Sequence, residues 1–485
     1  MKNNTPLLTA CCTLALSTGI LSACSSDGSS DGPDNDALRL AATLMAPIRS
    51  DLVSAKSGSF ENYLSRKSDC ENVPDGYAPL ESVAVLFLDD DGNTLPAPAL
   101  STDECGFFDA ALPDGVSRIS ASSVGNKPLI ASVTAINASG GIASTIPEDA
   151  EYRVGFLSAF DDTTLGFSIT DTVTNKAVVG LSTDAFTVSL DSQSVLFSSV
   201  TTGLASEQAS IVVVTDASGS MSNGAFSDEA TGIDYSRLNL SAIASHAFLD
   251  QKAPADEIAM VIFDGQTDFI DQDAINDIFT FEDANGMAAS YEFPATGFTQ
   301  DSAQMRLIVD AYNEDSQLWD EDNVFARHAD TPMLSATGRY EWGGSTAFYS
   351  SAILASDKLA ERNSPRKFIL AMTDGQNNRG ERDIQVVIET ANANRTPVYT
   401  IGFEFADEDD LTRIATETGA TYFQADSLEL TDAYNSIQTN ILFQYVGTLS
   451  EVVGNAEQIV LDFDIDADGV PEASRSISTA PVVTP

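Results

Sequence analysis

The sequence predicts a multidomain protein whose second half forms a doubly wound α/β domain, with β-sandwich modules before it and a short β tail after it. Three observations support this prediction. The apolar runs 211–214 and 368–372 each lead into an aspartate, as expected for buried parallel strands that end at a polar sheet edge. Residues 80–125 and 150–205 alternate apolar and polar residues between turn signals, which is typical of sandwich strands. The 485 residues suffice for several hydrophobic cores.

Oxygen-bearing side chains follow the first apolar run. Asp216, Ser218 and Ser220 form an Asp-x-Ser-x-Ser motif whose small residues require a turn. Ligands of open α/β sheets bind at this carboxyl edge, and oxygen donors without His or Cys favour Mg²⁺, Mn²⁺ or Ca²⁺. Thr346 follows two glycines and precedes a predicted helix, and Asp374 ends the second strand. The alternative is that these strand-end residues only cap helices.

The set Asp216, Ser218, Ser220, Thr346 and Asp374 resembles the metal-ion-dependent adhesion site of the von Willebrand factor type A domain, a Rossmann-like fold. The segments 236–250, 256–265, 396–405 and 411–425 are similar to that family's helices and strands, so the resemblance covers about residues 207–446. It implies that the two serines bind a divalent cation directly, with Thr346 joining when ligand is bound. It also implies that both aspartates act mostly through waters, and that a Glu or Asp carboxylate of a partner protein completes the shell. Mg²⁺ is the first expectation for the metal, with Mn²⁺ or Ca²⁺ as alternatives.

The charge balance restricts the partners. The chain has 72 acidic and 24 basic residues, a formal charge of −48. We therefore expect neither nucleic acid nor an anionic lipid surface as a partner, because the field of the protein repels phosphate.

The N-terminus predicts export and a lipid anchor. An apolar stretch, 6–20, precedes Leu21-Ser22-Ala23-Cys24, which resembles a bacterial lipobox. The resemblance implies removal of residues 1–23, lipidation of Cys24 and, because Ser25 follows, an outer-membrane location. Residues 24–36 are a polar, flexible tether. The alternative is a simple secretory signal with a chance cysteine.

The remaining cysteines predict a disulfide. Cys11 and Cys12 leave with the signal and Cys24 carries the lipid, so Cys70 and Cys105 form an even pair in an oxidising compartment. Two buried free thiols are the alternative.

Residues 37–206 divide into two predicted regions. In the first, 37–149, Leu40, Leu44, Ile48 and Leu52 recur at helical spacing and predict a helix within 37–68. Its part 80–125 resembles a transthyretin-like or carboxypeptidase-regulatory β-sandwich, with Gly106-Phe107-Phe108 in place of that family's Gly-x-Phe. For the acids 89–91 we favour a hairpin turn over a Ca²⁺ site. The second region, 150–206, resembles an immunoglobulin-like module.

Two further segments complete the chain. Residues 265–342 are an acidic connection, longer than the type A family usually has, with a predicted helix in 301–312 and both tryptophans, Trp319 and Trp342. We expect it near the metal edge. The tail, 447–485, alternates apolar residues with Asp462 and Asp464 and predicts a β-hairpin in preference to an EF-hand loop.

Together these features predict a metal-dependent, adhesion-type protein-binding lipoprotein. The alternative is a periplasmic or surface scaffold whose metal only stabilises the fold. An enzyme is not expected, because His246 and His328 are the sole histidines and neither adjoins a Ser or Cys in a recognisable motif. His246 is predicted to lie on a solvated helix face.

Overall fold

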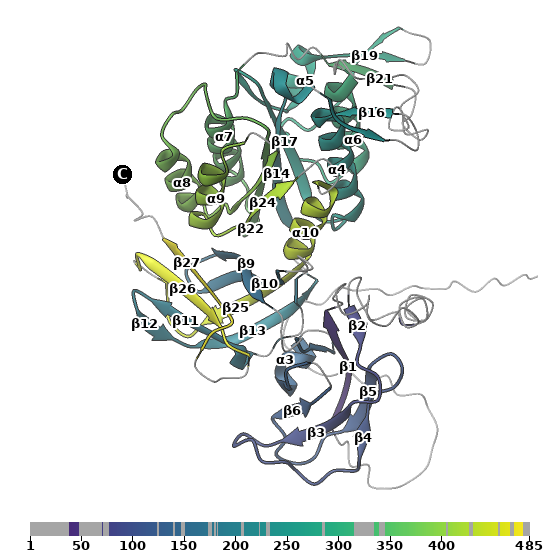
Figure 1. Ribbon diagram of the computed structural model, residues 1–485, viewed down its shortest axis with the longest axis vertical. Helices are drawn as coiled ribbons and strands as arrows, with labels where there is room; N and C mark the ends of the chain where they lie inside the picture. The colour runs from purple at the N-terminus through teal and green to yellow at the C-terminus, as the bar shows by residue number, and fades with distance from the viewer. Residues whose placement is uncertain are drawn as a thin grey trace, which may run out of the picture. The chain divides into compact units, whose positions relative to one another are not determined.

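Figure 1 shows the computed structural model of the protein. It describes residues 38–47, 70, 77–123, 126–138, 141–146, 151–172, 177–178, 181, 183–204, 208–222, 224–228, 233–283, 287–314, 334–338, 345–403, 406–425, 430–453, 456–465 and 470–478. Among these residues, no helix combines the length and apolar character that a membrane crossing requires.

The N-terminal β unit contains two small sheets over one core. The first sheet joins β1 (Arg39–Pro47) to β2 (Tyr77–Pro79), β5 (Phe107–Ala111) and β8 (Ile142–Ser144). The second has the order β4 (Leu100–Ser101), β3 (Ala84–Leu88), β6 (Arg118–Ala121) and β7 (Leu129–Ser132). The helix α3 (Val133–Ala138) follows β7. Both sheets supply the buried cluster that includes Leu44, Phe87 and Phe108.

The helix predicted within 37–68 is wrong where the structure describes this segment, because residues 39–47 form strand β1. Leu40 and Leu44 are both fully buried, and Ala42 and Ala46 between and after them are buried too. A spacing of four residues fits one face of a strand as well as one face of a helix. Residues 48–69 lie outside the described part of the chain.

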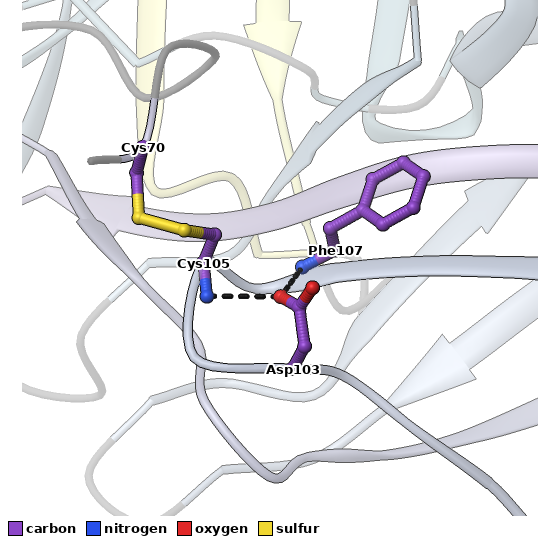
Figure 2. The surroundings of a disulfide bond; sticks show 4 residues. All are labelled: Cys70, Asp103, Cys105 and Phe107. Atoms are coloured by element: carbon purple, nitrogen blue, oxygen red, sulfur yellow. Dashed lines mark hydrogen bonds between the residues drawn. A yellow bond between two sulfur atoms is a disulfide. The ribbon is translucent and has the colours of Figure 1, made fainter.

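Cys70 and Cys105 form a disulfide that joins residue 70 to the turn between β4 and β5 (Figure 2). In that turn the Asp103 carboxylate accepts hydrogen bonds from the backbone N–H groups of Cys105 and Phe107, each at 2.9 Å. Gly106 has φ +70°, and a Cβ there would lie 2.3 Å from the Leu44 carbonyl oxygen. The Gly-Phe-Phe element singled out in the sequence therefore has its glycine where two backbones approach closely.

The acids 89–91 form a hairpin turn. Asp89 accepts hydrogen bonds from the backbone and side chain of Asn93, and the Arg118 guanidinium donates to the Asp90 carbonyl oxygen. A guanidinium on the carbonyls of this turn disfavours a cation site there.

A second β unit is built from strands that lie on both sides of the type A region in the sequence. One sheet has the order β13 (Phe197–Leu204), β25 (Phe443–Leu449), β10 (Thr164–Asp171) and β9 (Tyr152–Ala159). The other has the order β12 (Gln193–Val195), β11 (Phe186–Leu190), β26 (Gln458–Phe463) and β27 (Ala473–Ser478). A 3₁₀ turn, η1 (Thr183–Ala185), precedes β11. Figure 1 shows the yellow C-terminal strands beside the blue strands.

This pairing joins the segment predicted as an immunoglobulin-like module, 150–206, to the predicted β tail, 447–485, and to the strand β25 that precedes it. The two segments share one core, in which Phe167 stacks on Tyr445 and contacts Phe186. The predicted hairpin of the tail is confirmed by the antiparallel pairing of β26 with β27. The α/β domain is thus inserted between β13 and β25.

The inserted domain has a six-stranded sheet in the order β18 (Thr267–Phe269), β17 (Glu257–Phe263), β14 (Ala209–Asp216), β22 (Arg366–Thr373), β23 (Val398–Phe403) and β24 (Tyr422–Ala425). All neighbours are parallel except β18. Every residue of β14 and β17 is buried, which explains their unbroken apolar runs.

Helices cover both faces of this sheet (Figure 1). Ile211 and Val213 face a core shared with α4 (Arg237–Gln251), α6 (Ser302–Glu314) and α10 (Leu430–Leu442). Val212 and Val214 face α7 (Phe348–Ala360), α8 (Ile384–Ala393) and α9 (Glu408–Glu417). The prediction of a doubly wound α/β domain is confirmed.

The acidic connection contributes α5 (Gln272–Ile278), α6 and a small sheet of β20 (Ala288–Ala289), β19 (Phe279–Asp283) and β21 (Leu334–Gly338). The predicted helix in 301–312 is confirmed as α6. Trp319, Trp342 and His328 lie outside the described residues. A short hairpin of β15 (Gly224–Asp228) and β16 (Ile233–Ser236), which the sequence analysis missed, precedes α4.

The prediction of a solvated His246 is wrong, because this side chain is buried between α4 and α6. Its Nε2 lies 2.7 Å from Asp310 and its Nδ1 lies 2.5 Å from Arg306. The helix α6 belongs to the long connection, and its packing on α4 could not be read from the sequence of α4.

Candidate metal site

The Asp-x-Ser-x-Ser motif lies where β14 ends and a single turn of 3₁₀ helix, η2 (Gly219–Ser222), begins. Asp216 is fully buried, and its carboxylate accepts hydrogen bonds from the Ser218 backbone N–H at 2.7 Å and the Thr373 hydroxyl at 2.6 Å. These bonds fold the chain back on itself after the strand. Ser218 and Ser220 consequently face each other, with 3.1 Å between their Oγ atoms.

Asp374 joins this group from the neighbouring strand. It follows β22, which pairs directly with β14, so the ends of both strands meet at one edge of the sheet. The Ser220 hydroxyl donates to Asp374 Oδ1 at 2.6 Å. The sheet register thereby brings together residues 154 positions apart in the chain.

Thr346 reaches the same edge from the loop before α7. Its backbone N–H donates to the Asn378 side chain at 2.8 Å, and its carbonyl accepts from the backbone N–H groups of Asn378 and Arg379. A Cβ on Gly375 would lie 3.2 Å from Thr346 Oγ1, so the missing side chain lets the threonine approach the end of β22. The loops that carry Thr346 and Asp374 are thus tied together.

Arg237, at the start of α4, supplies a positive charge to this cluster. Its Nη1 lies 3.3 Å from Asp374 Oδ2 and donates to the Ser220 carbonyl at 2.9 Å. The arginine side chain is 7% exposed and that of Asp374 is fully buried. Arg237, Thr373 and Asn378 were not predicted from the sequence; the position of Arg237 shortly after the motif was the available signal.

The electrostatics of the cluster suit a cation. Burial, and then the charge of Asp374, raise the pKa of Asp216 to about 7. A divalent cation near both carboxylates would relieve this cost. No cluster of three or more His, Cys, Asp or Glu suited to a metal occurs in the described residues, so any ion at this edge relies on hydroxyl oxygens as well as carboxylates. Such a donor set fits Mg²⁺ or Mn²⁺.

The family comparison agrees with this geometry. Residues 335–436 match the model of the von Willebrand factor type A domain. The chain therefore contains a von Willebrand factor type A domain. The matched segment includes Thr346 and Asp374, whereas the Asp-x-Ser-x-Ser strand precedes it, on the other side of the long connection. No curated protein matches the chain.

Several solved structures are similar to this chain. An aerotolerance-related membrane protein from Bacteroides fragilis is 14% identical over 48% of this chain and 98% of its own, with a TM-score of 0.31. A von Willebrand factor type A protein from Catenulispora acidiphila is 10% identical over 68% of this chain and 75% of its own, with a TM-score of 0.31. Proximal thread matrix protein 1 from the mussel byssus, with a zinc-occupied metal site, is 15% identical over 50% of this chain and 48% of its own, with a TM-score of 0.32.

Proposed function

We propose that the type A domain is a protein-binding module that captures its partner through a divalent cation. Ser218, Ser220 and Thr346 would hold the ion directly, with Asp216 and Asp374 acting through waters. When bound, the cation supplies positive charge that attracts a carboxylate oxygen of an Asp or Glu on the partner. Mg²⁺ is the proposed ion, since it commonly retains exchangeable waters in protein sites.

One observation carries this proposal: residues from three separate chain segments converge with their oxygen atoms at one sheet edge. The contacts Ser218–Ser220 and Ser220–Asp374 join two of these segments, and Gly375 leaves space for Thr346 from the third. The hydroxyls of the cluster do contact carboxylates, Ser220 with Asp374 and Thr373 with Asp216. None of the described cluster residues is a His, Cys or Lys, the residues that most often act as a general base or an activated nucleophile. The cluster therefore supports ligand capture in preference to catalysis.

Calorimetric titration with Mg²⁺ and Mn²⁺ tests the metal site. We expect one ion per chain, and we expect Asp216→Ala to abolish binding while the circular dichroism spectrum is preserved. At a metal concentration ten times the dissociation constant, linkage stabilises the wild type by about 1.4 kcal/mol, and the variant lacks this increment. Unchanged titration of Asp216→Ala would refute the assignment.

A pull-down from outer-membrane extract tests partner capture. We expect chelation with EDTA and the substitution Thr346→Ala each to weaken capture. Thr421→Ala serves as the control. Thr421 directly precedes β24, away from the carboxyl edge of the sheet, and its hydroxyl donates to the Gly155 carbonyl of β9. If chelation and Thr346→Ala leave capture unchanged while metal still binds, the scaffold alternative is favoured.

We also propose that the protein is attached to the bacterial outer membrane through lipidated Cys24, a residue outside the described part of the chain. A polar tether alone cannot hold a protein at a membrane, whereas two or more acyl chains give stable attachment. We expect Cys24→Ser to move the protein to the soluble fraction of fractionated cells. Retention of this variant in the outer membrane would contradict lipid anchoring.

A further inference from the structure

We propose that Arg237 is a built-in counter-cation of the metal site. It weakens binding of the metal alone and favours binding of the metal together with an anionic ligand. This inference rests on the proposed metal site and adds a residue outside the predicted ligand set. Its basis is the contact of Arg237 with Asp374, one of the two carboxylates of the cluster.

Arg237 is fixed in this position by the fold. It is the first residue of α4, whose N-terminus is capped by Ser236 and Asn239. Its guanidinium bridges the Ser220 carbonyl at 2.9 Å and Asp374 Oδ2 at 3.3 Å. With 7% of its side chain exposed, it is poorly screened by solvent. The same guanidinium therefore orients the serine turn and neutralises the buried carboxylate.

The formal charges of the cluster explain why Arg237 favours an anionic ligand. Asp216, Asp374 and Arg237 together carry one net negative charge when both acids are ionised. A divalent cation changes this to one net positive charge, and a ligand carboxylate returns it to zero. Without Arg237, the two acids and the cation would already be neutral, and a carboxylate would add an unbalanced negative charge. The arginine thus makes an anionic ligand electrostatically favourable.

Arg237 also substitutes for the metal when no metal is bound. A buried carboxylate without a counter-charge is strongly destabilising. The ion pair offsets this cost for Asp374 and holds its Oδ1 on Ser220. We therefore expect the metal-free cluster to keep its arrangement and to depend on Arg237 for stability.

The test compares Arg237→Met, which keeps an unbranched apolar stem, with Arg237→Lys, which keeps the charge. Arg413→Met is the control, because it removes an exposed arginine that pairs with Glu417 on α9. Mn²⁺ affinity is measured by electron paramagnetic resonance at pH 8, with and without acetate as the anionic probe. Thermal unfolding in EDTA gives a readout that needs no metal.

We expect Arg237→Met to bind Mn²⁺ on the order of tenfold more tightly than the wild type, and to lose the enhancement of Mn²⁺ binding by acetate. Its melting temperature in EDTA should fall, and saturating Mn²⁺ should restore it. Arg237→Lys should stay close to the wild type, as should Arg413→Met.

Weaker or unchanged Mn²⁺ binding by a folded Arg237→Met would overturn the proposal, and so would acetate enhancement that persists in this variant. If the wild type binds no Mn²⁺, the proposed function itself fails. In that case the EDTA melting curves still decide whether Arg237 stabilises the cluster. If Arg237→Met does not fold, Arg237→Gln replaces it as the uncharged variant, and a Mn²⁺ affinity in Arg237→Gln no tighter than that of the wild type counts against the inference.

Discussion

At the scale of single residues, the cost of burying charge dominates the candidate site. Asp216 has no exposed surface, and two hydrogen-bond donors, the Ser218 N–H and the Thr373 hydroxyl, stabilise its carboxylate. Burial and the neighbouring Asp374 outweigh these donors and raise the pKa of Asp216 to about 7. The unfolded chain has no such penalty, so its carboxyl titrates near pH 4.

This difference predicts the direction of a pH effect. Between about pH 4 and pH 7, the folded metal-free protein binds a proton on Asp216 that the unfolded chain has lost. Its free energy of unfolding should therefore fall as pH rises, by on the order of 4 kcal/mol from this group across the whole range. Urea unfolding in EDTA at about pH 5 and pH 8 should show a larger loss for the wild type than for Asp216→Asn. Equal losses in the two proteins would show that Asp216 titrates normally.

At the scale of elements, a glycine governs the contact between the type A domain and β9. Gly419 follows Thr418, the C-cap of α9, and has φ +86°; its carbonyl accepts from the Leu157 N–H at 2.7 Å. A Cβ at this position would lie 2.0 Å from the Leu157 carbonyl oxygen. Close backbone approach and a left-handed conformation thus require glycine at the same residue.

We expect Gly419→Ala to lower the free energy of unfolding by about 2–4 kcal/mol, because positive φ and steric overlap with backbone both add to the cost. Gly115→Ala is the matched control: Gly115 has φ +81°, and its Cβ would meet nothing within 4 Å. That control should cost about 1 kcal/mol. Chemical unfolding curves measure both, and a similar cost for the two substitutions would mean that β9 moves away readily.

At the scale of the whole molecule, the type A domain is an insertion in a two-sheet unit. The strand β25 follows α10 without an intervening residue and occupies the place between β13 and β10. The tail strand β26 pairs with β11, and its residues Ile459, Leu461 and Phe463 are fully buried. Neither half of this unit is complete without the other.

A chain that ends at residue 453 should therefore lose the second β unit while the type A domain persists on its own two cores. Removing β26 and β27 deletes buried apolar side chains and exposes the edge of β11. Hydrogen exchange should show lost protection in β11 and β12 and retained protection in β14 and β17. If β11 is as well protected as in the full chain, its stability does not depend on pairing with the tail strand β26.

Local patterns determined much of the α/β domain and the candidate site. A buried parallel strand reads as a continuous apolar run, and polar residues just after it must lie at the sheet edge. Asp216, Ser218, Ser220 and Asp374 stand in such a local context, and Thr346 follows two glycines before a predicted helix, so their positions were accessible from the sequence. The disulfide followed from the small number of cysteines outside the predicted signal.

The tertiary structure alone decided features that depend on contacts between distant segments. Alternation in 458–463 indicates which face of the strand is buried but not that β11 is its neighbour. Leu40 and Leu44 fit a helix or a strand equally well, and pairing with β5 decided for the strand. His246 became buried through α6, and Arg237 met Asp374 because α4 begins beside the end of β22. The physical reason is common to all: periodicity encodes the burial of one segment, whereas the partner that buries it is a property of the assembled fold.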